Sequence, residues 1–122
     1  MDKNIKIAVA GVNSDAGKFG YKIFNGLAEA GFNVFAVGVR GGQVNGKTVY
    51  KSLKELPQKP DIVVTVVPPP GTEKVTQEAI ALGIKEIWMQ PGSRSDTAVI
   101  KAREAGIKVT DSGCFMIMLG LW

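Results

Sequence analysis

The residues best suited to chemistry form a small-residue segment, Gly11-Val12-Asn13-Ser14-Asp15-Ala16-Gly17-Lys18, between an apolar run and a helical pattern. We expect it to be the turn that joins a strand to a helix. Backbone N–H groups in such a turn, together with the positive helix end, bind phosphate groups. A turn that serves packing alone is the alternative. The candidate cofactor-binding residues here are Gly11, Val12, Asn13, Ser14, Gly17 and Lys18.

This segment matches neither of two common nucleotide-binding fingerprints. The dinucleotide pattern G-x-G-x-x-G would need glycines where the sequence has Gly11, Asn13 and Ala16. The P-loop pattern needs a Ser or Thr after its lysine, but Phe19 follows Lys18. Because the metal-binding hydroxyl is missing, a magnesium-dependent nucleotide hydrolase is disfavoured.

A second candidate, Gly38-Val39-Arg40, follows the next apolar run. An NAD site would place Asp or Glu here to bind the ribose hydroxyls. Arginine instead pairs with a phosphate on the ribose, as in NADP or in the 3′-phosphate of coenzyme A. Gly38 and Arg40 are therefore candidate cofactor-binding residues, and a solvated surface arginine is the alternative for Arg40.

Further candidates follow the third and fourth apolar runs. We expect Pro68-Pro69-Pro70 to form an extended apolar wall without N–H donors, with a helix starting near Gly71. Gln90 offers an amide donor and an acceptor to a ligand, or else to a structural partner. Cys114, the only cysteine, is more typical of an inert buried side chain than of a nucleophile.

Composition restricts the classes of function. The sequence contains no histidine, the commonest general base and metal ligand, which disfavours catalysis by this chain alone. The net charge of +4 favours an anionic ligand, but no basic run suggests nucleic acid. No apolar stretch approaches the roughly 20 residues that span a membrane. With a single cysteine, a cytoplasmic protein is expected.

The elements that must position these residues alternate between strands and helices. Apolar runs predict five strands, at residues 5–10, 34–39, 62–67, 86–90 and 107–110. The helical patterns between them end at Gly31, Gly83 and Gly106, as helices commonly do. Residues 40–50 are expected to be a loop with a tight turn at Asn45-Gly46, before a short helix at 52–56.

This alternation predicts a single domain over residues 1–122 with an α/β, three-layer, doubly wound Rossmann-type fold and about five parallel strands. Ligands of such sheets bind at the carboxyl ends of the strands, where the candidate turns would meet. Residues 115–122 are more apolar than a free terminus should be. We expect them to pack on the body or to bury a dimer contact.

In order and spacing, these segments resemble the CoA-binding domain family: small stand-alone proteins and the CoA-binding domain of the succinyl-CoA ligase α subunit. The resemblance runs nearly end to end and rests on residues 11–17, 37–38 before the loop at 40–42, 44–47 with Tyr50 and 52–53, the prolines from Pro68, 87–90 and Cys114. It implies phosphate contacts at Gly11, Val12, Asn13, Ser14 and Gly17, and the 3′-phosphate at Arg40. Pro68, Pro69 and Gln90 would guide the pantetheine arm.

The resemblance implies a protein that binds coenzyme A or acyl-CoA without catalysing a reaction alone, because the ligase carries its phosphorylated histidine in a second domain that this sequence lacks. Two alternatives remain at this stage. One is a small NADP-binding enzyme or redox sensor, and the other is the CoA-binding subunit of a larger acyl-CoA ligase. A homodimer or a ligase-type partner chain is expected, with no nucleic acid and no membrane.

Overall fold

The computed structural model describes all 122 residues around one seven-stranded sheet with the order β3-β4-β2-β1-β5-β6-β7. Every neighbouring pair is parallel except β3 and β4, which are antiparallel. The strands are β1 Lys6–Ala10, β2 Asn33–Val37, β3 Gln43–Val44, β4 Lys47–Tyr50, β5 Ile62–Thr65, β6 Glu86–Met89 and β7 Lys108–Thr110. The expected parallel sheet is confirmed, and β1, β2, β5, β6 and β7 are its five expected strands.

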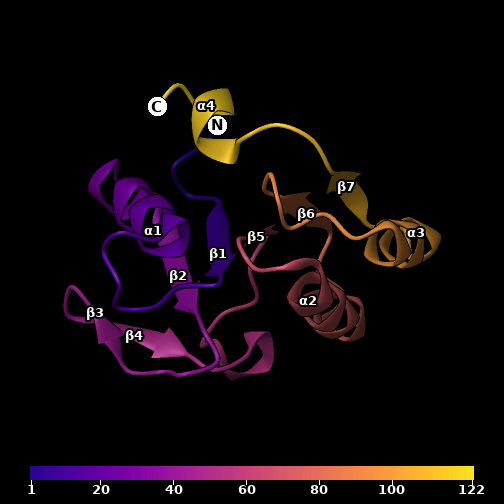
Figure 1. Ribbon diagram of the computed structural model, residues 1–122, viewed down its shortest axis with the longest axis horizontal. Coiled ribbons are helices and arrows are strands. Elements are labelled where there is room, and N and C mark those ends of the chain that lie inside the picture. The colour runs from indigo at the N-terminus through magenta and orange to yellow at the C-terminus, as the bar shows by residue number, and fades with distance from the viewer.

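The helices cover both faces of this sheet (Figure 1). They are α1 Phe19–Glu29, α2 Pro69–Leu82, α3 Asp96–Glu104 and the short α4 Phe115–Met118, with a 3-10 turn η1 at Leu53–Glu55. Gly31, Gly83 and Gly106 follow α1, α2 and α3 with φ of +89°, +70° and +82°. Glycine adopts this left-handed conformation without a Cβ clash, which confirms the expected helix ends.

Two apolar clusters, one on each face, make up the core. Alternate residues of β1 divide between them: Ile7 and Val9 pack in the cluster that contains α1 and α4, while Ala8 and Ala10 belong to the cluster with α2 and α3. β5 is buried along its whole length. A strand covered on both faces is apolar at every position, so the three-layer arrangement follows from the sequence.

Residues 40–50 differ from the expected loop, because they contain the antiparallel hairpin of β3 and β4. The strands have only two and four residues, too few for a pattern of alternating polarity to be recognised in the sequence. The expected tight turn is confirmed, since Asn45 and Gly46 have φ of 51° and 76°. β4 also pairs in parallel with β2 and so extends the sheet.

The expected extended wall of three prolines is wrong for two of them. Only Pro68 is extended, with ψ of 157°, and α2 begins at Pro69 rather than near Gly71. Proline suits the first helical turn, because its fixed φ is already helical and its missing N–H has no partner to lose there. None of the helices is both long and apolar enough to cross a membrane.

Candidate functional site

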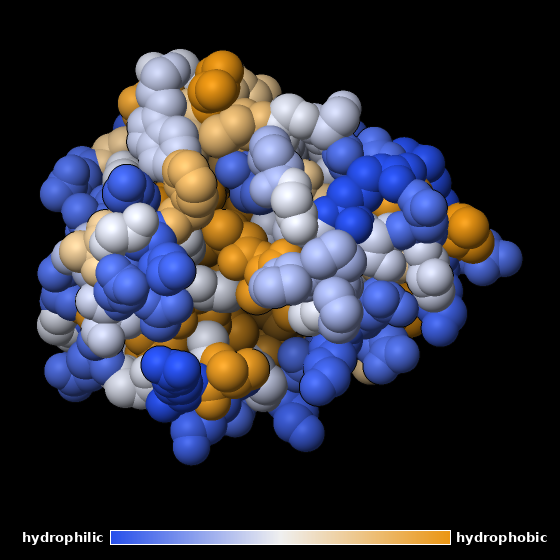
Figure 2. All heavy atoms as spheres, viewed as in Figure 1, coloured by the Kyte–Doolittle hydropathy of each residue, from blue (hydrophilic) through white to orange (hydrophobic).

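A cavity of about 910 Å³ opens at the carboxyl ends of β1, β2, β4 and β5. The space-filling view shows apolar residues in a hollow at the middle of this face, with hydrophilic residues around it (Figure 2). A second cavity of about 340 Å³ shares Gly11, Asn13, Lys18 and residues 66–68 with the first, so the two are continuous. Their volumes are in the range of small-molecule and cofactor sites.

Residues 11–18, which we name the phosphate turn, contribute Gly11, Val12, Asn13, Asp15 and Lys18 to the lining of the cavity. The N–H groups of Gly11 and Val12 both donate to the carbonyl of Val37, at 2.8 and 3.0 Å, which ties the turn to β2. Two side chains shape the rest: Asn13 Oδ1 accepts from the N–H of Asp15, and Asp15 Oδ1 accepts from that of Gly17, at 2.8 and 2.9 Å. The turn is therefore rigidly held by its own hydrogen bonds.

Several N–H groups at this end keep their donor capacity. Within the protein, the N–H groups of Asn13, Ser14, Phe19, Gly20 and Tyr21 have no acceptor. The last three form the first turn of α1, which has no side-chain cap and no acidic residue. Free N–H groups at a helix N-terminus, where the helix dipole is positive, attract phosphate groups.

Three glycines allow the backbone segments around the phosphate turn to touch. A Cβ at Gly11, where φ is +115°, would lie 2.3 Å from the carbonyl oxygen of Val66. A Cβ at Gly20 would lie 2.0 Å from the carbonyl oxygen of Gly11, and one at Gly38 equally close to that of Val12. Gly17 is less demanding, since its Cβ would meet only Asp15 Oδ1, at 3.3 Å.

The first turn of α2, on the other side of the cavity, has the opposite character. Pro69 and Pro70 have no N–H, and the N–H groups of Gly71 and Thr72 both donate to the carbonyl of Pro68, at 2.8 and 3.2 Å. No N–H of this turn is left for a ligand. The cavity therefore has free backbone N–H groups at the start of α1 and none at the start of α2.

The side chains that line the large cavity give it a positive charge. Glu78 and Asp15 are its only carboxylates, and each accepts a backbone N–H bond, Glu78 from Leu53 at 3.5 Å and Asp15 from Gly17. None of the cavity's cations forms an ion pair, because the four ion pairs of the protein lie elsewhere. These cations are Lys18, Arg40, Lys51, Lys54 and Lys74.

The predicted site residues divide into two groups. One group lines the large cavity and consists of Gly11, Val12, Asn13, Lys18, Gly38, Arg40 and Pro68. The other group lies outside both cavities and consists of Ser14, Gly17, Pro69 and Gln90. Gln90 is 5% exposed; its Oε1 accepts from the N–H of Phe115 at 2.6 Å, and its Nε2 donates to Cys114 Sγ at 3.3 Å. Its contact with a ligand stays a prediction.

Sequence reasoning missed Gly20 and three cavity lysines, Lys51, Lys54 and Lys74. Lys51 follows β4, a strand that was expected to be a loop. The run Thr48-Val49-Tyr50 after Asn45-Gly46 was the available signal, since β-branched and aromatic residues after such a turn are typical of a hairpin. Lys74 lies inside a helix, where nothing in the sequence tells which face meets a cavity.

Free N–H donors and unpaired cations at the carboxyl edge of a doubly wound parallel sheet are typical of nucleotide-binding proteins of the Rossmann type. The family follows from comparison with known proteins. The CoA binding domain family matches residues 5–120, and the chain belongs to this family. Coenzyme A is its cofactor, as the sequence predicted.

Two relatives come from Pyrococcus furiosus. The alpha subunit of acetate–CoA ligase (ADP-forming) I is 36% identical over 128 residues, and that of acetate–CoA ligase (ADP-forming) II is 31% identical over 123 residues. The matches cover 92% of this chain but only 28% and 27% of those subunits. The chain thus spans about a quarter of the length of these relatives.

A solved structure of similar size has the same fold. It is a conserved hypothetical protein of Pyrococcus furiosus, 33% identical, with a TM-score of 0.88. The match covers 93% of this chain and 98% of that one. The resemblance therefore includes proteins of about this length as well as parts of ligase subunits.

Proposed function

We propose that the chain is a CoA-binding module, one domain over residues 1–122, that holds coenzyme A or acyl-CoA without catalysing a reaction alone. The pyrophosphate lies against the phosphate turn and the first turn of α1, and the pantetheine arm runs along residues 66–68 toward the second cavity. One observation supports this orientation above all: the first turn of α1 has free backbone N–H donors, and the first turn of α2 has none.

The fit of coenzyme A to this cavity has two parts. The free N–H groups of the turn and of α1, with Lys18, match a pyrophosphate, which has acceptors only. The wall formed by Val66, Val67 and Pro68 is apolar and suits a mostly aliphatic arm. The bound cofactor supplies a thiol that carries acyl groups, and the chain's own residues bind and orient it.

Binding without chemistry is supported by the state of the reactive side chains. Both cavity carboxylates are already engaged by backbone N–H groups, as described above. Cys114 lines neither cavity, and its sulfur accepts a hydrogen bond from Gln90. Neither the two cavity carboxylates nor the Cys114 thiol is therefore free to act as a general base or a nucleophile in the cavity.

Calorimetry with purified protein tests this proposal. We expect coenzyme A and acetyl-CoA to bind with one site per chain and NADP to bind much more weakly. Incubation with acetyl-CoA should release no free thiol above the rate of its spontaneous hydrolysis. Binding of NADP in preference to coenzyme A would contradict the proposed ligand, and rapid thiol release would contradict the absence of catalysis.

We further propose that the chain acts in the cytoplasm with a partner chain of the acyl-CoA ligase type. Support comes from its two relatives, which are named as alpha subunits of ligases. Five apolar side chains are also at least 38% exposed at one end of the molecule. They are Phe19, Ile117, Met118, Leu121 and Trp122.

A homodimer through the same residues is the second candidate. Phe115 and Met116, which were expected in the contact, are fully buried in the core, so the contact is restricted to the remainder of the segment. Sedimentation velocity over a hundredfold range of protein concentration separates the two proposals. A concentration-dependent dimer that Ile117→Ser abolishes supports the homodimer, whereas a monomer at every concentration contradicts it.

A further inference from the structure

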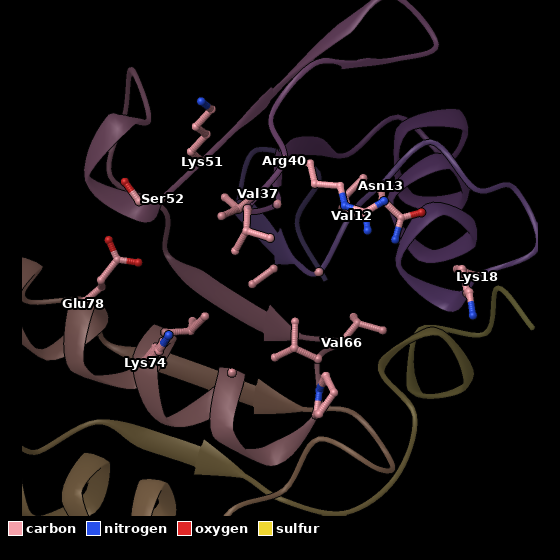
Figure 3. A pocket seen from close by; sticks show the side chains of 18 of the residues that line it. Val12, Asn13, Lys18, Val37, Arg40, Lys51, Ser52, Val66, Lys74 and Glu78 are labelled. Atoms are coloured by element: carbon pink, nitrogen blue, oxygen red, sulfur yellow. The ribbon is translucent and has the colours of Figure 1, made fainter.

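The cations of the large cavity lie on two facing walls. Figure 3 shows Arg40 near Val12 and Asn13, and Lys74 with Glu78 on α2 across the cavity. Lys51 lies against Gly41, the residue that follows Arg40. Lys54 of η1 adds a third lysine to the lining of the cavity. Because none of them has a carboxylate within 4.0 Å, their charges are uncompensated within the protein.

Lys51 is supported by the loop that carries Arg40. A Cβ built on Gly41 would lie 3.1 Å from Cε and 3.3 Å from Cγ of Lys51, so the lysine side chain passes directly over this glycine. Gly41 has φ of +63° and follows Arg40 in the chain. The absence of a side chain at position 41 thus leaves room for Lys51 beside Arg40.

Lys74 is supported by the contact between α2 and η1. Leu53 of η1 is 2% exposed, and its N–H donates to Glu78 Oε1 at 3.5 Å. Glu78 is four residues after Lys74 in α2, so the two side chains lie on the same face of the helix. Glu78 Oε1 accepts the N–H of Leu53, Lys74 forms no ion pair with Glu78, and both residues line the cavity.

A phosphomonoester needs more than one cation. Near neutral pH it carries a charge of about −1.5 to −2 and three acceptor oxygens. The pyrophosphate of coenzyme A already has the phosphate turn and α1, on the opposite side of the cavity from Lys74. The 3′-phosphate, attached to the ribose, is the remaining anionic group of the same ligand.

We infer that Lys51, from the side of Arg40, and Lys74, from the α2 wall across the cavity, bind the 3′-phosphate of coenzyme A, so that this phosphate is held from two sides. This inference rests on the proposed orientation of the cofactor. It makes the two lysines determinants of specificity: they favour coenzyme A over ligands that lack a phosphate on the ribose. The phosphate turn, by contrast, binds both kinds of ligand.

The test compares coenzyme A with dephospho-CoA, which differs from it only in the 3′-phosphate. Lys51→Ala and Lys74→Ala should each weaken the binding of coenzyme A about three- to fivefold, and the double variant should weaken it about tenfold or more. All three variants should weaken the binding of dephospho-CoA less than twofold. The selectivity should fall as salt is added, because the lysines are exposed. Lys101→Ala is the matched control, since it removes one exposed charge from α3, away from both cavities.

Three results decide the inference. Selective loss of coenzyme A binding in the double variant, with Lys101→Ala unchanged, supports it. The second result is that the wild type binds coenzyme A but the double substitution weakens the binding of both ligands equally, or of neither. The lysines are then not a 3′-phosphate site, and the inference fails while the proposed function stands. If the wild type binds neither ligand, the proposed function itself fails.

Discussion

Gly20 and Gly11 touch through their backbones: a Cβ on Gly20 would lie 2.0 Å from the carbonyl oxygen of Gly11. The first turn of α1 therefore packs directly against the end of β1. In the dinucleotide fingerprint the third glycine allows this close packing of helix and strand. The sequence does not match this fingerprint. Gly20, nine positions after Gly11, nevertheless fills the structural role of its last glycine.

Gly20→Ala should destabilise the fold by about 1–3 kcal/mol, because the new methyl group meets backbone atoms that cannot move independently. The midpoint of urea denaturation measures this loss. Gly17→Ala is the control, since φ at Gly17 is not positive and its Cβ would meet only Asp15 Oδ1. Equal losses in the two variants would show that the contact between Gly20 and Gly11 is not tight in solution.

Arg40→Ala should weaken the binding of coenzyme A by roughly tenfold to a hundredfold, which corresponds to the loss of one charge-assisted hydrogen bond. Dephospho-CoA should bind almost as before, because it lacks the phosphate that Arg40 is predicted to contact. Calorimetry with both ligands gives the answer, and Arg40→Lys should recover part of the affinity. An equal loss for both ligands would assign Arg40 to the pyrophosphate instead.

Asn45 should stabilise the hairpin in two separate ways. It adopts φ of 51° in the turn, and its side chain accepts from Tyr21 Oη at 3.2 Å and donates to Asn25 Oδ1 at 2.7 Å. Asn45→Gly keeps the turn but loses the bonds to α1, at a cost of about 1 kcal/mol. Asn45→Ala also strains the turn and should lose about 1 kcal/mol more.

Thermal unfolding of these two variants, with Tyr21→Phe alongside, checks the order. Tyr21→Phe removes only the hydroxyl bond and should be the mildest of the three. If Asn45→Gly were as stable as the wild type, the bonds to α1 would contribute nothing. If Asn45→Ala matched Asn45→Gly, the left-handed turn would cost no strain.

Asp111 should make the stability depend on pH in the acid range. The hydrogen bond from Arg94, at 2.9 Å, holds the pKa of the Asp111 carboxyl below its usual value of 3.8. A lowered pKa in the folded state stabilises the protein above the unfolded value, and this contribution is lost as pH falls through the folded one. Asp111→Asn should therefore be less stable than the wild type at pH 7, by a small margin because the pair is exposed.

The difference between Asp111→Asn and the wild type should shrink as pH falls below the ordinary carboxyl pKa of 3.8 and through the lower pKa of the folded state, because the wild-type carboxyl then also becomes neutral. Melting temperatures across this range provide the measurement. Glu104→Gln, an exposed residue of α3 outside the four ion pairs, should show no such trend. A constant difference at every pH would mean that the variant acts through packing rather than charge.

The centre of the sheet could be predicted from the sequence because its strands β1 and β5 are buried on both faces. β1 and β5 are nearly all apolar, and the glycines at 31, 83 and 106 end helices for a local steric reason. The turn at residues 11–18 was also recognisable, because small residues between a strand and a helix have few other uses. These features are determined by residues close together in the chain, so they can be predicted from the sequence.

The rest depends on contacts between distant segments. Lys51 and Lys74 are ordinary exposed lysines until η1 packs on α2 and encloses the cavity. The sequence left open whether Gln90 meets a ligand or a structural partner, and in the structure its amide bonds to Phe115 and Cys114, 25 and 24 residues later in the chain. Tertiary packing decides which partner a buried amide meets, and no local pattern records that choice.

The pairing of β1 with β5 has a mechanical consequence. These two adjacent strands belong to different halves of the chain, and the cavity lies over their carboxyl ends. A cofactor in the cavity would contact the first half of the chain through the phosphate turn and the second half through α2. It would therefore link the two halves across the pairing of β1 with β5. Separation of β1 from β5 would then require release of the cofactor. The amide protons that bond β1 to β5 should therefore exchange more slowly as coenzyme A is added.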